Sequence, residues 1–334
     1  MVSFGDFSRR YTKRYLVKRI LTLFVALFAV LILNFLLPRM MPGNFLTLYV
    51  ESLERQHPGV NAKAIAERVA ALYGLNVPPY EQFLHYLREI LSIDPNFGPS
   101  FQYYPTNAWT VVVYAVKWTL LLLGTSQAVS WLLGIFIGIT MAFHKDRPLD
   151  RALQPTFYFL NTIPLFWIGL VFILLFAVYF KVLPPSGAYG IHPGLTSVLR
   201  HLVLPLSVIV IGTLPTHALV IRGAALEVLS SDFVQAARAQ GIRRRSFLNM
   251  VLKNSLLPSL TQLFLSIGYL IGGIYTVEVT FSYPGMGSVI YNAITAQDYP
   301  VIQAALYLTT LVVILANLAA DLLYPLVDPR VSYV

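Results

Sequence analysis

Long apolar stretches without Asp, Glu, Lys or Arg dominate the chain. A helix needs about 20 apolar residues to cross the hydrocarbon core of a bilayer. Six stretches reach that length and are predicted to be membrane-spanning helices. They are residues 20–38, 118–144, 152–180, 201–221, 254–277 and 299–320. The pattern therefore predicts an all-α integral membrane protein built as a bundle of six spans.

Two further uncharged stretches, 182–199 and 279–297, differ from these six because they are rich in Pro and Gly. An unbroken helix there would lose backbone hydrogen bonds that lipid cannot replace. We therefore expect loops or re-entrant turns at both places.

The polar parts of the chain lie between and around the predicted spans. Residues 39–108 form the longest of them and are predicted to be an external subdomain. Its stretches Ala62–Leu72 and Tyr80–Leu91 have apolar residues at helical spacing. The remaining division is a terminal segment 1–19, a core 109–325 that contains the polar loop 223–255, and a tail 326–334.

Composition agrees with a membrane protein. Hydrophobic residues make up 57% of the 334 residues and charged residues only 12%, whereas about 25% is usual in soluble domains. The first apolar stretch runs into Leu37-Pro38-Arg39-Met40 without a small-residue cleavage site, so we expect a span there and not a cleaved signal peptide. The absence of cysteine excludes disulfides and thiolate chemistry.

The distribution of positive charge predicts the orientation. When alternate polar segments are assigned to the cytoplasm, starting from the first, sixteen of the 24 Lys and Arg lie inside and seven outside. The positive-inside rule then places both termini in the cytoplasm of a multi-pass protein in the cell membrane.

Searches for catalytic and metal-binding patterns are negative. The sequence has no Walker A phosphate loop, no HExxH and no GxSxG. Its histidines are scattered, and only His57 and His85 could share the external region, so we expect no metal site. The chain is predicted not to be an enzyme, and any energy for transport must come from another chain.

Charged residues close to the spans bear on an alternative, an ion-coupled carrier. Lys117, Glu278 and Asp321 each lie next to a predicted span. We expect all three at span ends, where long side chains can reach the membrane–water interface. An ion-coupled carrier usually has a carboxylate inside the membrane. The pattern disfavours that class, and a membrane scaffold or receptor stays open.

Small residues at GxxxG spacing predict close helix contacts. Gly134 and Gly138 form one pair, and Gly268 and Gly272 form another. Such pairs let backbones approach one another in lipid. We interpret both as packing sites.

The loop between the fourth and fifth spans contains a short predicted helix. Ser230, Ser231 or Asp232 can cap its start through a side-chain oxygen, and Gly241 suits the left-handed position at its end. Alanines give the helix a small face, and arginines flank it. Two interpretations remain from the residues alone: a loop resting on anionic headgroups, or a helix that docks into a partner's groove.

Ordered motifs along nearly the whole chain carry a resemblance. The loop has Gln235-Ala236-Ala237, then Gly241, and Leu257-Pro258 further on. The other motifs are Pro42-Gly43, Leu72–Leu75, Ile163–Gly169, Leu226–Leu229, Phe281–Gly287, Asp298–Val301, Asp321–Tyr324 and Asp328–Arg330. In this order they resemble the type I ABC importer permeases, and within them the dipeptide/oligopeptide/nickel branch.

The resemblance implies that the short helix is a coupling helix, which docks in a cleft of a cytoplasmic ATPase. The coupling residues carried over are Asp232, Gln235, Ala236, Ala237 and Gly241. It also implies a second homologous permease, two ATPase subunits and an external solute-binding protein as partners, with no nucleic acid. ATP and Mg would be bound by the ATPases and no cofactor by this chain. Gln235 stands where the family usually has Glu. This difference puts a charge contact with the ATPase in doubt, but it does not put the docking in doubt.

Substrate and pathway are less determined. Phe166, Trp167, Pro284 and Gly285 are candidates for a pathway or gate; packing for the first two and a scaffold turn for the others are the alternatives. The resemblance favours di- or oligopeptides as substrate. Oligosaccharides stay open because the external aromatics Phe101–Thr106 and Trp109 could stack on sugars, or could belong to the subdomain's own core.

Overall fold

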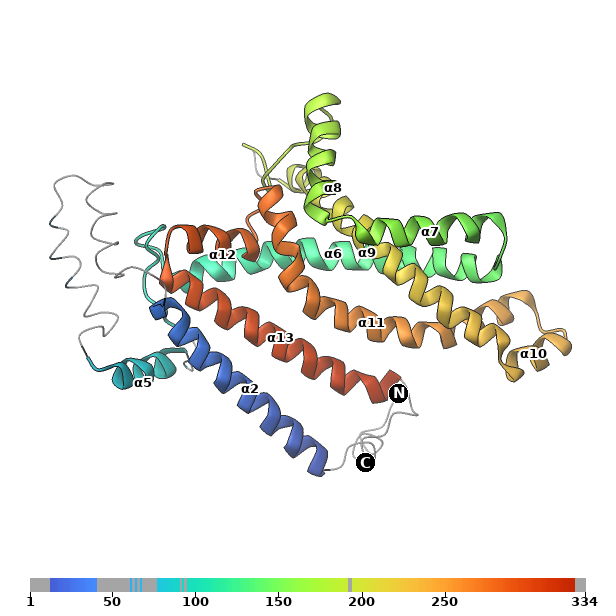
Figure 1. Cartoon of the computed structure of the whole chain (residues 1–334), viewed down its shortest axis with the longest axis horizontal. Coiled ribbons are helices and arrows are strands. Elements are labelled where there is room, and N and C mark those ends of the chain that lie inside the picture. The colour runs from blue at the N-terminus through green and yellow to red at the C-terminus, as the bar shows by residue number, and fades with distance from the viewer. Residues whose placement is uncertain are drawn as a thin grey trace. The chain divides into compact units, whose positions relative to one another are not determined.

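The computed structural model describes residues 13–40, 77–90, 92, 95–191 and 194–327, with the isolated positions 61, 64 and 67. These residues form helices and one isolated β-bridge, between Pro99 and Asn107. In chain order the helices are α2 (Lys13–Met40), α5 (Pro79–Ile90), α6 (Ala108–Phe143), α7 (Pro148–Thr162), α8 (Leu165–Phe172), the π-helix η1 (Ile173–Tyr179), α9 (Leu195–Ser230), α10 (Asp232–Ala239), α11 (Arg244–Thr280), α12 (Met286–Thr295) and α13 (Tyr299–Val327) (Figure 1). The all-α prediction is confirmed for the part of the chain described.

Membrane spans are only partly recognisable from length and composition. Among the described residues, α6 and α9 are long and apolar enough to cross a bilayer, and α7 with α8 and η1 would add a third if the bent pair is one span. The apolar parts of α2 and α13, Leu21–Leu36 and Tyr299–Leu315, are shorter. The count of six spans stays a prediction.

The third predicted span, 152–180, is not one straight helix. It is divided between α7 and the α8–η1 segment, which are bent by 97° (Figure 1). Pro164 lies at the break, and Ile163 before it has extended backbone at φ −82° and ψ 125°. A proline has no amide hydrogen and forces the preceding residue away from helical dihedrals. The proline therefore ends α7, and α8 begins directly after it.

Both stretches predicted as loops contain helix. Residues 182–191 are non-helical as expected, but α9 already begins at Leu195. In 279–297, α11 continues to Thr280, and Met286–Thr295 forms α12. Helix is possible there because the prolines and glycines of this stretch gather at 284–287, which leaves the following residues free of helix breakers.

The described residues belong to two compact units. Among the described residues, one comprises 118–191, 194–287 and 315–327, and the other comprises 13–40, 61, 64, 67, 77–90, 92, 95–117 and 288–314. Helix α6 contributes its first ten residues to the second unit and the rest to the first. Lys117, expected at a span end, lies exposed inside α6 because this helix begins ten residues before the predicted span.

The second unit is held together by aromatic and polar contacts. Trp109 stacks on Phe97 at 5.9 Å between ring centres, and Tyr307 packs against both rings. Asp298, fully buried, accepts hydrogen bonds from the Ser100 hydroxyl and from the backbone amides of Phe101 and Gln102. Trp109 is therefore part of this unit's own packing. Tyr103 and Tyr104 are 41% and 59% exposed, so the choice between core and sugar stacking is settled for Trp109 alone. Of the two predicted external helices, Tyr80–Leu91 is confirmed as α5, and Ala62–Leu72 lies outside the described residues except for positions 64 and 67.

Helix α6 packs on α9 through the Gly134–Gly138 pair, as predicted. A Cβ built on Gly134 would lie 2.6 Å from the His217 Cβ, and one on Gly138 would lie 2.5 Å from the carbonyl oxygen of Ala218. Even a single Cβ atom does not fit at either position, so glycine is required for the close approach of α6 and α9. The other pair, Gly268 and Gly272, lies in α11, where the side-chain surroundings are not among those described.

We expect Gly138→Val to destabilise the first unit by about 1–3 kcal/mol, because the added atoms collide with the backbone of α9 and overpack the contact. Thermal unfolding of the purified chain in detergent measures this loss. Gly124→Val is the matched control on the same helix, since a Cβ at Gly124 meets nothing within 4 Å. Equal unfolding temperatures for the two variants would contradict the packing role.

Candidate functional site

The short helix predicted in the 223–255 loop is α10, between the end of α9 and the start of α11 (Figure 1). Its eight residues carry one buried side chain, Val234, which is 1% exposed. Val234 faces the junction with α9 and α11, on which α10 packs. One apolar anchor thus fixes the helix while most of its surface stays free.

Most of the remaining surface of α10 is open. Asp232, Gln235 and Ala236 are exposed, and Ala237 is half-buried. Arg238 lies with its guanidinium 5.1 Å from the centre of the Phe247 ring, a cation–π contact that ties α10 to α11. Phe233 is also 49% exposed, so the open surface of α10 combines polar, small and aromatic side chains that a partner's cleft can cover.

Gly241 ends α10 in the predicted conformation. Its φ is +68°, in the left-handed region that favours glycine. Its amide donates to the Arg238 carbonyl at 3.1 Å, and the Ile242 amide donates to the Ala237 carbonyl at 3.4 Å. This turn reverses the chain so that α11 can begin at Arg244.

The predicted side-chain cap is wrong in its detail. Ser231 holds the cap position with extended backbone, but no side chain accepts a bond from the first amides of α10. The Ser230 and Ser231 hydroxyls instead donate backward to carbonyls in the last turn of α9. Asp232 lies in the first turn, where a negative charge favours the helix dipole. The serine side chains therefore bond to the end of α9, and Ser231 occupies the cap position of α10 without a side-chain cap bond.

Gln235 has a contact that a glutamate could not make. Its Nε2 donates to the Ser230 carbonyl at 3.1 Å, and so satisfies an orphan carbonyl at the end of α9. A carboxylate only accepts hydrogen bonds. At this position the amide thus contributes to the corner between α9 and α10.

A buried ion pair lies near the same end of α9. Asp150, fully buried in the first turn of α7, accepts two hydrogen bonds from Arg222 of α9: Nε donates to Oδ1 at 2.6 Å, and Nη2 to Oδ2 at 2.8 Å. Asp150 Oδ2 also accepts from the Asp146 amide at 3.0 Å. The pair fastens α7 and the turn before it to the helix that leads into α10. Sequence reasoning missed it, although one acid and one base at the ends of two predicted spans were an available signal.

We expect Asp150→Asn to destabilise the first unit by about 1–3 kcal/mol. The amide keeps one acceptor but places a donor opposite the Arg222 guanidinium, which loses a charge-assisted contact. Arg222 is 15% exposed and can reach water, which limits the cost. Thermal unfolding in detergent checks this, with the exposed Glu227→Gln as control. A melting curve like that of the parent chain would show that the pair contributes nothing measurable.

The candidate gate residues Pro284 and Gly285 lie in the turn between α11 and α12, next to a second buried charge. Glu278 is 0% exposed. Its Oε1 accepts from the Thr119 hydroxyl at 2.7 Å and its Oε2 from the Gly287 amide at 2.6 Å. A Cβ on Gly285 would lie 2.1 Å from Oε1. The expectation that Glu278 reaches an interface is therefore wrong, because its carboxylate is enclosed by the turn that it supports.

Tyr283, in the same turn, is also enclosed. Its ring lies edge-on to Trp118 at 5.9 Å. Burial raises the pKa of its phenol above the ordinary value, and the negative charge of Glu278 adds to the rise. The hydroxyl therefore stays neutral at physiological pH. These contacts describe a tight scaffold turn at Pro284 and Gly285, and a gate there stays a prediction.

The other pathway candidates are on the surface. Phe166 and Trp167 are 45% and 53% exposed on α8, whereas their neighbours Ile168 and Gly169 are buried. Gly169 faces Phe281 and Thr280 at the end of α11. Phe166 and Trp167 are therefore not part of this chain's described core, and their role along a pathway stays a prediction.

The remaining sequence predictions concern metals and the third charged residue. Among the residues that the structure describes, no three His, Asp or Glu side chains gather as metal ligands. His85 is exposed on α5, and His57 lies outside the described residues. Asp321 lies in α13, but its side chain is also outside them. The absence of a metal site stays a prediction.

Residues 134–333 match the family described as "Binding-protein-dependent transport system inner membrane component". The chain is 30% identical over 322 residues to the oligopeptide transport system permease protein AppB of Bacillus subtilis, covering 96% of this chain and 99% of that protein. It is 30% identical over 342 residues to the di/tripeptide transport system permease protein DppB of Pseudomonas aeruginosa, with 96% and 98% covered. It is 28% identical over 346 residues to the dipeptide transport system permease protein DppB of Escherichia coli K12, with 96% and 99% covered.

Proposed function

Because this chain belongs to the inner membrane components of binding-protein-dependent transport systems, we propose that it is the permease through which an ATP-driven ABC importer takes up di- and oligopeptides. The permease role follows from family membership, and such a subunit is not itself catalytic. The peptide substrate rests on one observation: relatives whose names specify peptides align with 96% of this chain. Membership of this family also removes the ion-coupled carrier and the scaffold as alternatives.

The proposal includes a six-span topology with both termini in the cytoplasm. The charge distribution supports this orientation. It places α10 and the Asp150–Arg222 pair on the cytoplasmic side and the Phe281–Gly287 turn on the external side. A permease of this topology offers α10 where an ATPase can reach it.

We assign coupling to the exposed face of α10, with Asp232, Gln235, Ala236 and Ala237 as contact residues and Gly241 as the terminator. Small side chains on this face let a partner's cleft close around the helix. Val234 and the Arg238–Phe247 contact tie α10 to α9 and α11, so a displacement of α10 is passed to these helices as a rigid-body movement. The Gln235 amide supports the corner itself, and the docking does not need a charge at this position.

The partners in this proposal are a second related permease, two ATPase subunits that bind ATP and Mg, and an external solute-binding protein. Peptides are preferred to oligosaccharides because relatives named for peptides align with 96% of this chain. Trp109, one of the aromatics that could stack on a sugar, packs instead against Phe97 and Tyr307. The solute-binding protein is expected to select the substrate before it reaches this chain.

Co-purification and uptake test the proposal. We expect the tagged chain, extracted from its native membrane in mild detergent, to bring with it a second permease and ATPases with Walker motifs, identified by mass spectrometry. Vesicles containing that complex and its binding protein should accumulate labelled di- or oligopeptides only with ATP inside the compartment that holds α10. Accumulation of oligosaccharides and not peptides would overturn the assignment of a peptide substrate. Recovery of the chain alone would overturn the assignment of the partners.

A further inference from the structure

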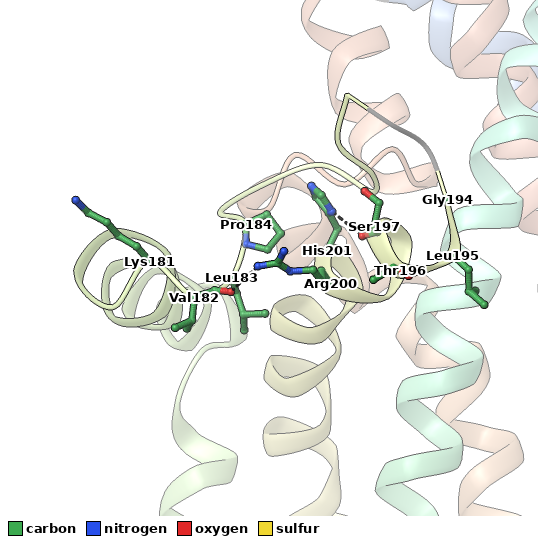
Figure 2. Close-up of a pocket in the computed structure, with 10 residues that line it drawn as sticks. All are labelled: Lys181, Val182, Leu183, Pro184, Gly194, Leu195, Thr196, Ser197, Arg200 and His201. Atoms are coloured by element: carbon green, nitrogen blue, oxygen red, sulfur yellow. Dashed lines mark hydrogen bonds between the residues drawn. The ribbon is translucent and has the colours of Figure 1, made fainter.

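A cavity of about 590 Å³ lies where η1 gives way to the start of α9 (Figure 2). The other end of α9 leads into α10 (Figure 1). The chain after η1 contributes Lys181 and Val182, and the start of α9 contributes Leu195, Ser197, Arg200 and His201. None of these residues has a part in the coupling surface or in the turn that contains Gly285. The cavity is therefore a separate feature of the molecule.

The polar groups of the cavity are cationic or neutral. Figure 2 shows Arg200 beneath Pro184 and His201 beside it, with Lys181 at the rim pointing outward. Neither Lys181 nor Arg200 forms an ion pair with any residue that the structure describes. The stretch that lines the cavity contains no acid, since none occurs between Asp150 and Glu227. Two positive charges at one cavity without an internal counter-ion favour an anionic ligand from outside the chain.

Hydrogen bonds hold two of these groups in place. Arg200 Nη2 donates to the Val182 carbonyl at 3.2 Å, which fixes the guanidinium against the loop. His201 Nδ1 lies 2.8 Å from the Ser197 carbonyl. Because a carbonyl only accepts, Nδ1 donates to it and Nε2 is left for another contact. The cavity thus presents a guanidinium whose other nitrogens remain available and one imidazole nitrogen, with the flexible Lys181 side chain at its rim.

The surroundings of the cavity indicate where that ligand comes from. Tyr179, Phe180, Val182 and Leu195 are all more than half exposed. They flank the cations at the point where η1 ends and α9 enters its apolar stretch. Aromatic and apolar side chains next to Lys and Arg at the end of apolar helices are typical of the membrane interface. Lipid phosphates lie at that depth, and acyl chains can cover the exposed apolar side chains.

We propose that this cavity binds the phosphate of an anionic phospholipid, such as phosphatidylglycerol, from the external leaflet. Arg200 and Lys181 bind the phosphate oxygens, His201 adds a hydrogen bond, and Val182 and Leu195 contact the first part of the acyl chains. The site ties the turn between η1 and α9 to the bilayer surface. This inference concerns the lipid around the permease and does not depend on which solute is transported.

Lipid titration followed by native mass spectrometry tests the site. The full chain, purified with its partner subunits and delipidated in neutral detergent, is titrated with dioleoylphosphatidylglycerol and separately with dioleoylphosphatidylcholine. We expect the parent complex to bind the phosphatidylglycerol more tightly than the phosphatidylcholine. In the double variant Lys181→Gln/Arg200→Gln this preference should fall by about tenfold, as expected for a lost charge-assisted contact. Arg88→Gln removes an exposed cation from α5, outside this unit, and should leave the preference unchanged.

Two further arms keep the outcome decisive. Arg200→Gln removes the bond to Val182, so Lys181→Gln alone, a residue without a described hydrogen bond, is measured as a variant that leaves the loop intact. Millimolar inorganic phosphate is added as competitor to the lipid. An undiminished preference in both the single and the double variant would overturn the site. Displacement by free phosphate as effectively as by lipid would overturn the lipid assignment in favour of a free-anion site.

Discussion

Gly241→Val is expected to abolish most ATP-driven uptake while the rest of the chain stays folded. The residue has φ +68°, and a side chain in the left-handed region costs about 1–2 kcal/mol, and more when it is β-branched. A penalty of this size lowers the population of the native turn by roughly 5- to 30-fold. Since that turn sets the direction of α10 relative to α11, fewer molecules would present the helix correctly to an ATPase. Peptide uptake by vesicles containing the whole complex measures the effect.

The matched control is Gln240→Val, one residue earlier. Gln240 is exposed as Gly241 is, but its φ of −75° accepts any side chain. A Cβ on Gly241 itself meets nothing within 4 Å, so both variants place an exposed valine without a clash and differ in backbone strain. Gly241→Asn should lie between them, because asparagine tolerates the left-handed region. If Gly241→Val and Gln240→Val take up peptide equally, the turn is not required for coupling.

Glu278→Ala is expected to destabilise the first unit by about 2–4 kcal/mol. The change removes the acceptor of the Thr119 hydroxyl and of the Gly287 amide, and each buried group left unsatisfied costs roughly 1–3 kcal/mol. Relief of the buried negative charge offsets part of this cost. Thr119 also accepts from the Met286 amide at 2.8 Å, so the loss is passed to the first residues of α12. Thermal unfolding and peptide uptake of the same preparation measure stability and function together.

Two variants distinguish the effect of the carboxylate's hydrogen bonds from the effect of the space that the side chain occupies. Glu278→Gln keeps the volume and one acceptor, and should cost less than Glu278→Ala. Gly285→Ala keeps the carboxylate but pushes it away, since the added Cβ would overlap Oε1, and should resemble Glu278→Ala. The exposed Glu227→Ala serves as control for loss of an acid. An unfolding temperature unchanged in Glu278→Ala would show that this carboxylate does not hold the turn.

Local features of the sequence predicted the parts of the coupling site that depend on neighbouring residues. Gly241 was identifiable because a helix that ends before a second helix needs a left-handed residue there. The serines before α10 were correctly placed at its start, but their bonding was not. A hydroxyl at that position can accept from the following helix or donate to the preceding one, and only the path of α9 decides between them.

The buried charges show the limit of reasoning from the sequence. Glu278 and Asp150 both looked like acids at the ends of apolar stretches, where contact with water is the simplest expectation. Their partners, Thr119 and Arg222, are 159 and 72 residues away along the chain. No periodicity or spacing in one sequence relates positions so distant, and whether a carboxylate is solvated or enclosed depends on that relation.

By itself the sequence determined that this chain is a helical membrane protein. It also determined which polar segments carry the positive charge, and where the exposed helix of the long loop begins and ends. These properties follow from composition, hydrophobic length and local backbone preference. Only the tertiary structure decided that Pro164 bends the third apolar segment, that Gly138 meets the backbone of α9, and that Glu278 supports the turn at Gly285. Those results depend on contacts across the fold, because packing and hydrogen bonding join segments that are far apart along the chain.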